Sequence, residues 1–464
     1  MFRKVEIWVL YLVVLIGILF AIGFGVLVRQ EIVGDTKLGK IDISLISRPA
    51  AYIAGLPEQT LKLILKPNPN RINDPWDEER FFYTQNGFVG TPNSNKSYLL
   101  LSRYDGDLND GIVELVDLQN FQIIHTWNPD IDKFNDLVDQ VEEFKYLDRD
   151  DSDRRKTLMH PMLTKDGGLL FGWNSPLRKI DECSNLIFQN THDMFHHSIE
   201  IDDDSNIWMP THMYPQKLPF EKVGRSLMSD NGYLDDGIVM LSSDGEVLFE
   251  KSVSEIFLEN NLEYLLFSVG DLTFNRDPIH LNDIQPVNND GKYWKKGDVF
   301  LSLRHQSMIM LYRPSSNEII WKGTGPFFHQ HDVDILDDHK ISIFDNNAKI
   351  LEGGRTVDGY NRVIIYDFNK NEYSSYLTES LEENDVRTPN QGRGQILLNN
   401  DLIVEESFYA RLLYFNNNGS LRWSHVNRAK NGNVYKVGWS RILYTQEDIK
   451  NVESFMNNKI TCDE

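Results

Sequence analysis

A strand pattern that recurs six times is the feature of this sequence that most restricts its fold. Each copy has an apolar strand, a polar gap or turn, a second strand, a tight turn rich in Asn, Asp, Gly and Ser, and a third strand that often ends in an aromatic residue. The copies begin at YLLLSRYDGD, LLFGWNSPLR, NIWMPTHMYPQ, DVFLSLRHQS, ISIFDNN and DLIVEESFYA. Another short alternating strand precedes five of them, in HPMLTKDGG, HHSIEIDDDS, HLNDIQPVNNDG, HQHDVDILDDH and GQILLNND. Repeated four-stranded antiparallel units without a helical period are typical of a β-propeller.

We therefore predict an all-β fold, a six-bladed β-propeller over residues 95–430. A single blade cannot bury both of its faces, whereas blades stacked in a ring bury them against their neighbours. The content of 25 Phe, 19 Tyr and 9 Trp agrees with β structure. Residues 31–94 are predicted to be an irregular lead-in with one short helix around residues 57–65, and residues 431–464 a C-terminal extension. A pair of β-sandwiches is the structural alternative.

The N-terminal region contains an apolar stretch at residues 7–28. Its 22 residues rise about 33 Å as a helix, enough to cross the hydrocarbon layer of a bilayer. Arg3 and Lys4 precede the stretch, which favours a cytoplasmic N-terminus. We predict that residues 1–30 form a transmembrane signal anchor that ties the protein to the membrane. The catalytic domain would then be periplasmic or otherwise extracytoplasmic. A cleaved signal sequence is the alternative.

Charge and cysteine content restrict the partners and the chemistry. The formal net charge is −22, and so acidic a surface repels phosphate backbones, so nucleic acid is not an expected partner. The two cysteines, Cys183 and Cys462, do not form a CxxC motif. A cysteine-based zinc or redox site is therefore excluded, while a disulfide between the two stays an open alternative.

Six of the twelve histidines stand where the predicted innermost strands begin. Those strands line the central channel of a propeller, so residues far apart in sequence converge there. The residues concerned are His160, His196, His197, His280, His329 and His331, together with Asn282. In HHSIEI, IHLNDI and HQHDVDI, the residues His197, Asn282 and His331 are equivalent, and each is followed by Ser or Asp and then Ile or Val. His280 and His329 stand two residues earlier, so strand alternation predicts that they share a side with Asn282 and His331.

The next strand contributes a guanidinium to this predicted cluster. The motif SLRHQ adds Arg304 and His305. Several neutral imidazoles with one guanidinium form a site for a tetrahedral oxyanion, because Arg matches two oxygens and a neutral His serves as nucleophile or donor. The sequence contains no GxSxG elbow, P-loop or strand–helix GxGxxG motif. Glu405, Glu406 and Asp345 are candidate bases.

These motifs resemble the arylsulfotransferase (aryl-sulfate sulfotransferase) family. The segment from GDVFLSLRHQ to ISIFDNN carries the resemblance, with HHSIEIDDDSNIWM before it and QGRGQILLNNDLIVEES after it. It covers residues 95–427, in the order HH, HxN, SLRH, QHD and FDN. The resemblance implies a six-bladed propeller and an extracytoplasmic enzyme that needs neither a cofactor nor the nucleotide sulfate donor. It also implies ping-pong transfer of a sulfuryl group through a sulfohistidine, from an aryl sulfate to a phenol.

The resemblance also implies roles for individual residues. His331 of QHD would be the nucleophile, His280 and Arg304 would hold the sulfuryl oxygens, and His197 would complete the cage. The expected substrate-binding residues are His196, Asn282, His305 and His329. Of these, His305 or His329 is the candidate general acid, and His196 is the alternative to His197. Ser198 replaces the Asp that the family carries after HH, which leaves the substrate range open.

Two other functions are compatible with the sequence. One is a propeller that binds a ligand or serves as a scaffold without catalysis. The other is a metal site on the central histidines, which suit zinc or copper. Because Arg304 in the same cluster disfavours a cation, no metal is expected there. His160, His192 and His212 are predicted to be hydrogen-bonded structural histidines. Arg393, between two glycines, could approach the channel from the last blade, although an Arg in that setting more often serves a turn or a surface contact. The oligomeric state stays open.

Overall fold

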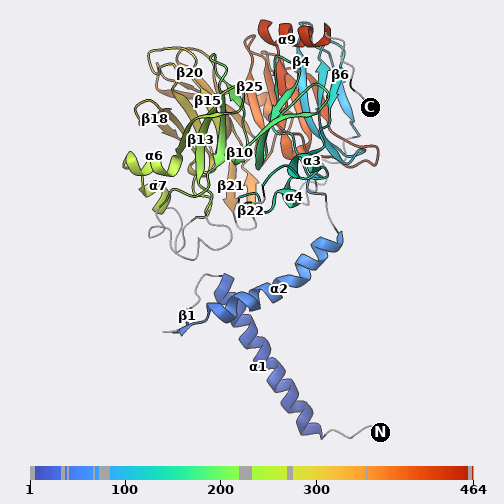
Figure 1. The fold of residues 1–464 in the computed structure, drawn as a ribbon, viewed down its shortest axis with the longest axis vertical. Coiled ribbons are helices and arrows are strands. Elements are labelled where there is room, and N and C mark those ends of the chain that lie inside the picture. The colour runs from blue at the N-terminus through green and yellow to red at the C-terminus, as the bar shows by residue number, and fades with distance from the viewer. Residues whose placement is uncertain are drawn as a thin grey trace. The chain divides into compact units, whose positions relative to one another are not determined.

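The protein is described by a computed structural model. It covers residues 6–32, 37–38, 41–65, 68–72, 84–139, 141, 143–218, 233–268, 275–351, 354–457 and 462. The chain divides into two compact units, Met1–Asn68 and Pro69–Glu464. The first is helical and the second is built from β-sheets (Figure 1).

The first unit contains two helices, α1 (Ile7–Ile32) and α2 (Ser44–Leu65), and the short strands β1 (Lys37–Leu38) and β2 (Ile41–Asp42). By length and composition α1 fits either a membrane anchor or a signal sequence. Glu31 accepts a hydrogen bond of 2.6 Å from Ser47 Oγ, which joins α1 to α2. Helix α2 is much longer than the short helix expected at residues 57–65. The prediction treated Pro57 as a helix start, but the Ala- and Leu-rich sequence before it continues the helix.

The second unit has an all-β, propeller-like arrangement. Four of its sheets have four or five antiparallel strands. The first consists of β15 (Leu281–Pro286), β16 (Val299–Leu303), β17 (Met308–Arg313) and β18 (Glu318–Thr324). The second consists of β19 (His331–Ile335), β20 (Lys340–Asp345), β23 (Arg362–Asp367) and β24 (Glu372–Tyr376). The third consists of β25 (Arg393–Ile396), β26 (Leu402–Glu406), β27 (Arg411–Phe415), β28 (Leu421–Val426) and β3 (Gly87–Gly90). The fourth consists of β29 (Arg441–Leu443), β4 (Tyr98–Asp105), β5 (Asp110–Asp117) and β6 (Gln122–Trp127).

The remaining predicted strands form one eight-stranded sheet. Its members are β7 (Met162–Leu163), β8 (Leu169–Phe171), β9 (Ser175–Ile180), β10 (Leu186–Phe195), β11 (Glu200–Ile201), β12 (Ile207–His212), β13 (Asp236–Leu241) and β14 (Val247–Ser252). A separate hairpin of β21 (Ala348–Leu351) and β22 (Gly354–Val357) interrupts the second sheet in sequence. It projects from the end of this unit where the short helices α3 (Ile131–Asn135), α4 (Leu147–Asp150), α6 (Val253–Glu259) and α7 (Tyr264–Phe267) also lie (Figure 1).

Two strands come from outside the predicted repeats. The sheet of β4 takes its first strand, β29, from residues 441–443, which the sequence assigned to a C-terminal extension, and Arg441 pairs with Leu100. The sheet of β25 gains a fifth strand, β3, from residues 87–90 of the predicted lead-in, and Trp423 pairs with Gly90. Both pairings join segments that are more than 300 residues apart, so no local pattern indicates them.

The core lies between the sheets, because the apolar strands bury side chains on both faces. All five residues of β16 are buried. Leu301 packs in a cluster with Trp208 of β12, whereas its neighbour Phe300 packs with Ile343 of β20 on the other side. Successive side chains of a strand point to opposite faces, so one strand contributes to two inter-sheet cores. This two-sided burial is what the stacked-blade prediction requires.

Hydrogen bonds between neighbouring innermost strands explain the recurring Ser or Asp followed by Ile or Val. In each case the Ser or Asp side chain accepts a main-chain N–H from the next innermost strand along the chain. The bonds run from Ile284 N to Ser198 Oγ (3.2 Å), from Val333 N to Asp283 Oδ2 (2.7 Å) and from Gly394 N to Asp332 Oδ2 (3.1 Å). All three side chains are buried. The pattern therefore fixes the positions of the strands that carry the candidate site.

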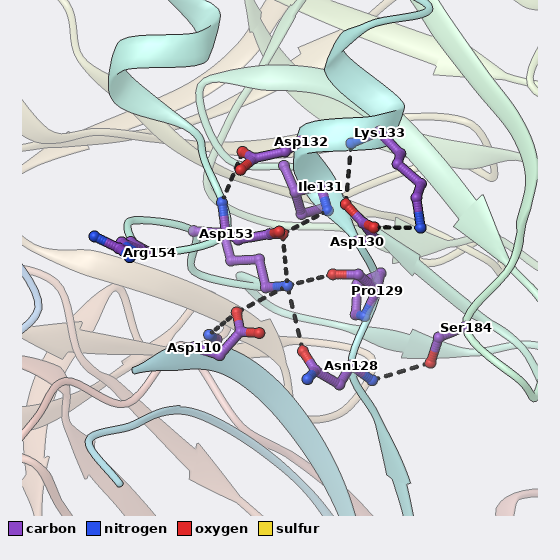
Figure 2. Close-up of polar contacts among 12 residues, drawn as sticks. Asp110, Asn128, Pro129, Asp130, Ile131, Asp132, Lys133, Asp153, Arg154 and Ser184 are labelled. Carbon is purple, nitrogen blue, oxygen red and sulfur yellow. Dashed lines mark hydrogen bonds and ion pairs between the residues drawn. The ribbon is translucent and has the colours of Figure 1, made fainter. Parts of the chain in front are cut away.

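A buried ammonium group holds the connection between β6 and β7. Lys156 Nζ lies 2.9 Å from Asp110 Oδ1 and 3.3 Å from Asp153 Oδ1, and it also donates to Asn128 Oδ1 and to the Pro129 carbonyl. Figure 2 labels these four partners. The Lys156 side chain is 1% exposed. Buried charges are stable only when paired and hydrogen-bonded, so this network anchors the connection to the start of β5.

A disulfide holds the C-terminal end of the chain. Cys183 and Cys462 are bonded, with their Cα atoms 5.4 Å apart. The sequence left this pairing open. Ahead of Cys462, Phe455 of α9 (Gln446–Asn457) stacks on the buried Trp127 at 5.8 Å between ring centroids. The C-terminal segment is therefore integrated into the β-sheet unit.

Candidate active site

The site begins with six residues in left-handed backbone conformation, one shortly before each of the strands β7, β11, β15, β19, β25 and β29. They are His160 (φ 45°), His197 (φ 59°), His280 (φ 55°), His329 (φ 52°), Gln391 (φ 53°) and Trp439 (φ 56°). Non-glycine residues adopt this conformation at a cost in free energy, and such residues cluster at functional sites. The alternation argument for His280 and His329 was therefore wrong, because both stand in turns ahead of β15 and β19 rather than on a strand.

Three of the predicted histidines lie together, and two of them contact one indole. The ring centroid of His197 lies 5.3 Å from that of His280 and 6.2 Å from that of His331. Trp439 stands 6.0 Å from His197 and 6.1 Å from His331, and Trp173 covers His197 at 5.0 Å. Trp439 was not predicted. The signal that could have found it is its place two residues before a short apolar strand, as at the other strand openings.

His331 has a defined tautomer because of Asn346. His331 Nδ1 lies 2.6 Å from Asn346 Oδ1, while Asn346 Nδ2 donates to the carbonyls of Thr388 (3.0 Å) and Gln391 (2.7 Å). These carbonyls accept only, so they orient the amide and leave its oxygen to accept a proton from His331 Nδ1. The lone pair is then on Nε2, which is buried and has no hydrogen-bond partner among the described residues. Burial, then the charge of Arg304, lowers the pKa of His331 well below 6.5.

Arg304 is held by His305. Its Nη1 lies 2.8 Å from His305 Nε2, and His305 Nδ1 lies 2.6 Å from the Asp277 carbonyl. His305 therefore donates through Nδ1 and accepts from the guanidinium through Nε2. Burial, followed by the charge of His280, lowers the pKa of His305 to about 4. The other donors of Arg304, Nε and Nη2, are buried without a partner in the described part of the chain, so the guanidinium keeps one edge for an anion.

His280 is oriented by a carboxylate. Its Nδ1 lies 2.6 Å from Asp277 Oδ2, and its ring centroid is 4.6 Å from that of His305. Burial is the largest influence on the pKa of Asp277 and would raise it, but the hydrogen bond and charge of His280, together with the charge of His305, outweigh burial and the pKa is lowered. Asp277 thus stays ionised and directs His280 Nε2 away from itself.

The other predicted substrate-binding residues occupy different places. His196 lies behind His197, with the two Nδ1 atoms 2.7 Å apart, and stacks on His212 at 4.0 Å. Asn282 donates to the Gln330 carbonyl at 2.9 Å, and its buried Oδ1 has no partner among the described residues. His329 lies further out, where its Nδ1 is 2.7 Å from the Ala348 carbonyl of the hairpin β21–β22.

Several remaining candidates are structural. His160 Nδ1 accepts a hydrogen bond from Ile199 N at 3.1 Å, and its Nε2 lies 2.7 Å from Arg393 Nη1, so both ring nitrogens have protein partners, as predicted for a structural histidine. Arg393 itself is 3% exposed and pairs with Asp332 at 3.3 Å, so of the two alternatives for this residue the structure excludes the surface contact.

The three candidate bases are also committed to structural contacts. Glu405 accepts the main-chain N–H groups of Trp439 and Ser440, both at 2.6 Å, and so fixes the turn that carries Trp439. Glu406 pairs with Arg411 and Asp345 with Arg362, each at 2.5 Å.

Comparisons with known proteins give a family and distant structural likenesses. The family model described as arylsulfotransferase (ASST) matches residues 160–428. No curated protein matches the chain. Among solved structures, a protein of unknown function from Bacteroides caccae is 11% identical, with 72% of this chain and 94% of that chain covered and a TM-score of 0.44. The WD40 β-propeller domain of Doa1 is 11% identical, with coverage of 78% and 98% and a TM-score of 0.37. A streptogramin B lyase is 10% identical, with coverage of 76% and 96% and a TM-score of 0.34.

Proposed function

The chain belongs to the arylsulfotransferase family, and on that premise we propose that it transfers a sulfuryl group from an aryl sulfate ester to a phenol through a sulfohistidine at His331. The observation that carries this proposal is the Nε2 of His331, which has no hydrogen-bond partner among the residues that the structure describes and whose lone pair is fixed by Asn346. A neutral imidazole with one free lone pair is the form of histidine that acts as a nucleophile.

In the first step, His331 Nε2 attacks the sulfur atom, and the bond between sulfur and the phenolic oxygen breaks. A sulfohistidine and a phenolate result, and the phenolate takes up a proton. In the second step, an acceptor phenol loses its proton and attacks the same sulfur, which frees His331. Such a transfer needs in-line positioning and charge stabilisation more than covalent activation.

We assign the proton transfers to His280. His305 was one candidate acid, but its Nε2 accepts a hydrogen bond from Arg304 and the pKa of its ring is lowered to about 4. Its Nε2 therefore has no proton to give to a phenolate. His280 Nδ1 lies 2.6 Å from the Asp277 carboxylate, so Asp277 orients the ring and leaves its Nε2 to exchange a proton with the phenolic oxygen. The ring centroid of His280 lies 5.3 Å from that of His197, so His280 belongs to the same histidine cluster.

Arg304 and His197 would hold the sulfuryl oxygens. The free edge of Arg304 offers Nε and Nη2, a planar pair of donors that matches two oxygens of a tetrahedral anion. Trp439 and Trp173 border His197 at 6.0 Å and 5.0 Å, so their rings would form the apolar wall for the aryl group. Asn282 and His329 are proposed to contact the substrate at the edge of the site. His196 is proposed to orient His197 through the contact between their Nδ1 atoms.

For the scaffold we propose six blades, with the eight-stranded sheet counted as two, β7–β10 and β11–β14. The six left-handed residues ahead of six innermost strands support this count. We further propose that α1 anchors the protein and that the catalytic domain is extracytoplasmic. The disulfide between Cys183 and Cys462 supports that location, because disulfides persist in oxidising compartments.

The test uses the full chain in detergent with 4-nitrophenyl sulfate and an added phenol. Wild type should release 4-nitrophenolate, form the sulfated phenol and give a mass-spectrometric sulfo adduct on His331 when the acceptor is omitted. His331→Asn should lower transfer by about 10³-fold or more, since the nucleophile is lost. If wild-type protein with normal circular dichroism shows neither transfer nor adduct, the proposal fails and a binding or scaffold function takes its place.

A further inference from the structure

A second group of buried polar atoms that have no hydrogen-bond partner in the described part of the chain lies directly behind His197. Its members are His196, His212 and Asp236, which come from three adjacent strands of one sheet. His196 follows β10, His212 ends β12 and Asp236 begins β13. His212 and Asp236 are register partners across β12 and β13. His196 was predicted as a substrate-binding residue and His212 as a structural histidine, whereas Asp236 was not singled out.

The ligand-type atoms of this trio converge. His196 Nε2 and His212 Nδ1 each lie 3.4 Å from Asp236 Oδ1. All three atoms lie within 4.8 Å of one another. Neither of these ring nitrogens nor either Asp236 oxygen has a hydrogen-bond partner among the described residues. Asp236 is 0% exposed and His196 is 1% exposed, and a buried carboxylate without a partner is costly unless a cation or proton compensates it.

We propose that His196, His212 and Asp236 bind a divalent cation of the zinc type. Two imidazole nitrogens and one carboxylate oxygen are a common zinc donor set, and bonds of 2.0–2.1 Å in a tetrahedron place ligand atoms about 3.4 Å apart. The two contacts with Asp236 Oδ1 have this separation. The stacked rings of His196 and His212 have to spread to share one ion, and His212, with 18% of its side chain exposed, is the ligand that can turn.

The ion would set the tautomer of His197. When His196 Nε2 binds the metal, the remaining proton of His196 is on Nδ1, and a metal-bound histidine donates that proton to a neighbouring acceptor. Here the acceptor is His197 Nδ1 at 2.7 Å. His197 then carries its own proton on Nε2, on the opposite edge of the ring, as a donor for a sulfuryl oxygen. The role of His197 as a donor for a sulfuryl oxygen rests on the proposed function. The ion site itself does not rest on it.

The metal content of the full chain tests the site. The protein is purified in detergent, without a polyhistidine tag or chelator, supplied with zinc, and analysed by plasma mass spectrometry after desalting. We expect about one zinc per chain in wild type, and a loss of at least 80% of it in His212→Gln and in Asp236→Asn. Substitution with Co²⁺ should give the visible absorption of a tetrahedral nitrogen–oxygen site in wild type, which reports on the site without any variant.

Two control variants locate the ion. His192→Gln changes a half-exposed histidine paired with Glu250 at 2.6 Å, and it should keep the zinc. His331→Asn should also keep the zinc while it loses transfer. If wild-type protein binds zinc but does not transfer sulfate, the ion site is retained and the proposed function is overturned. Folded wild type that transfers sulfate but binds neither zinc nor Co²⁺ at micromolar concentrations would overturn the ion site alone. Zinc retained in both His212→Gln and Asp236→Asn would also overturn it.

Discussion

Asn346 fixes the proton of His331, because its side-chain oxygen lies 2.6 Å from His331 Nδ1 while its nitrogen donates to two main-chain carbonyls. The amide cannot rotate without placing its oxygen against those carbonyls. Asn346 belongs to the FDNN segment at the end of β20, the strand that pairs with β19, and Phe344 and His331 are register partners there. The pairing of the two strands therefore brings together the proposed nucleophile on β19 and Asn346, one position beyond β20.

Replacing Asn346 should impair transfer without preventing binding. In Asn346→Ala, His331 is free to carry its proton on Nε2, so we expect kcat to fall about 10²-fold with a smaller change in KM. Rapid-mixing measurement of the 4-nitrophenolate burst separates sulfation of His331 from later steps. Asn347→Ala is the matched control, because Asn347 donates to Asp358 and Tyr360 carbonyls rather than to His331. Equal losses in both variants would contradict the role of Asn346.

Arg304 and His305 should differ in the size of their effects. Arg304→Lys keeps the charge but loses the paired donors, so we expect kcat/KM to fall about 10²- to 10³-fold. His305→Gln retains an acceptor for Arg304 Nη1, which lies 2.8 Å from His305 Nε2 in the wild type. Its loss should be about 10-fold or less. A His305→Gln defect as large as that of Arg304→Lys would instead point to a direct chemical role for His305.

The pH profile should report the lowered pKa of His331. Burial and the charge of Arg304 stabilise the neutral ring, so the folded pKa is well below 6.5. The nucleophile is neutral above that pKa, and activity should be lost only as the pH falls through it. We therefore expect kcat/KM to be unaffected by His331 protonation near pH 6.5. In Arg304→Met the acid limb should move to higher pH, because the guanidinium charge that helps to lower the pKa of His331 is removed. An unchanged limb in that variant would show that another group titrates there.

Asp283 should make the fold less stable at alkaline pH. Burial, then the nearby charges of Asp332 and Glu200, raises its pKa to about 8. A carboxyl group whose folded pKa is above its unfolded pKa of 3.8 stabilises the fold at low pH. This contribution is lost as the pH rises through the interval between the two values. Asp283→Asn keeps an acceptor for Val333 N and removes the titration. We expect a flatter dependence of Tm on pH between about 5 and 9, measured by circular dichroism. A wild-type Tm that is equally flat would contradict the raised pKa.

Much of the fold and part of the site were predictable because their signals are local. Alternation and turn residues predicted the strands of the repeats, and the six histidines at strand openings indicated where those strands converge. The Ser or Asp after each opening was also visible, and the structure adds its reason, since Ser198, Asp283 and Asp332 each bond the next innermost strand. The roles assigned to His331, His280, Arg304 and His197 stay predictions, and the structure brings the rings of His197, His280 and His331 together.

The sequence by itself determined the strand repeats, the apolar N-terminal helix and the residue types of the central site, because these are written in spacings of a few residues. Only the tertiary structure decided which imidazole edge faces the site, that Trp439 joins it, that Asp236 lies between His196 and His212, and that Cys183 bonds Cys462. Each of these features depends on contacts between distant segments or on a left-handed turn. Such contacts and turns produce no periodic pattern in the local sequence. Proton positions follow from hydrogen-bond partners, so they are known only once the partners are known.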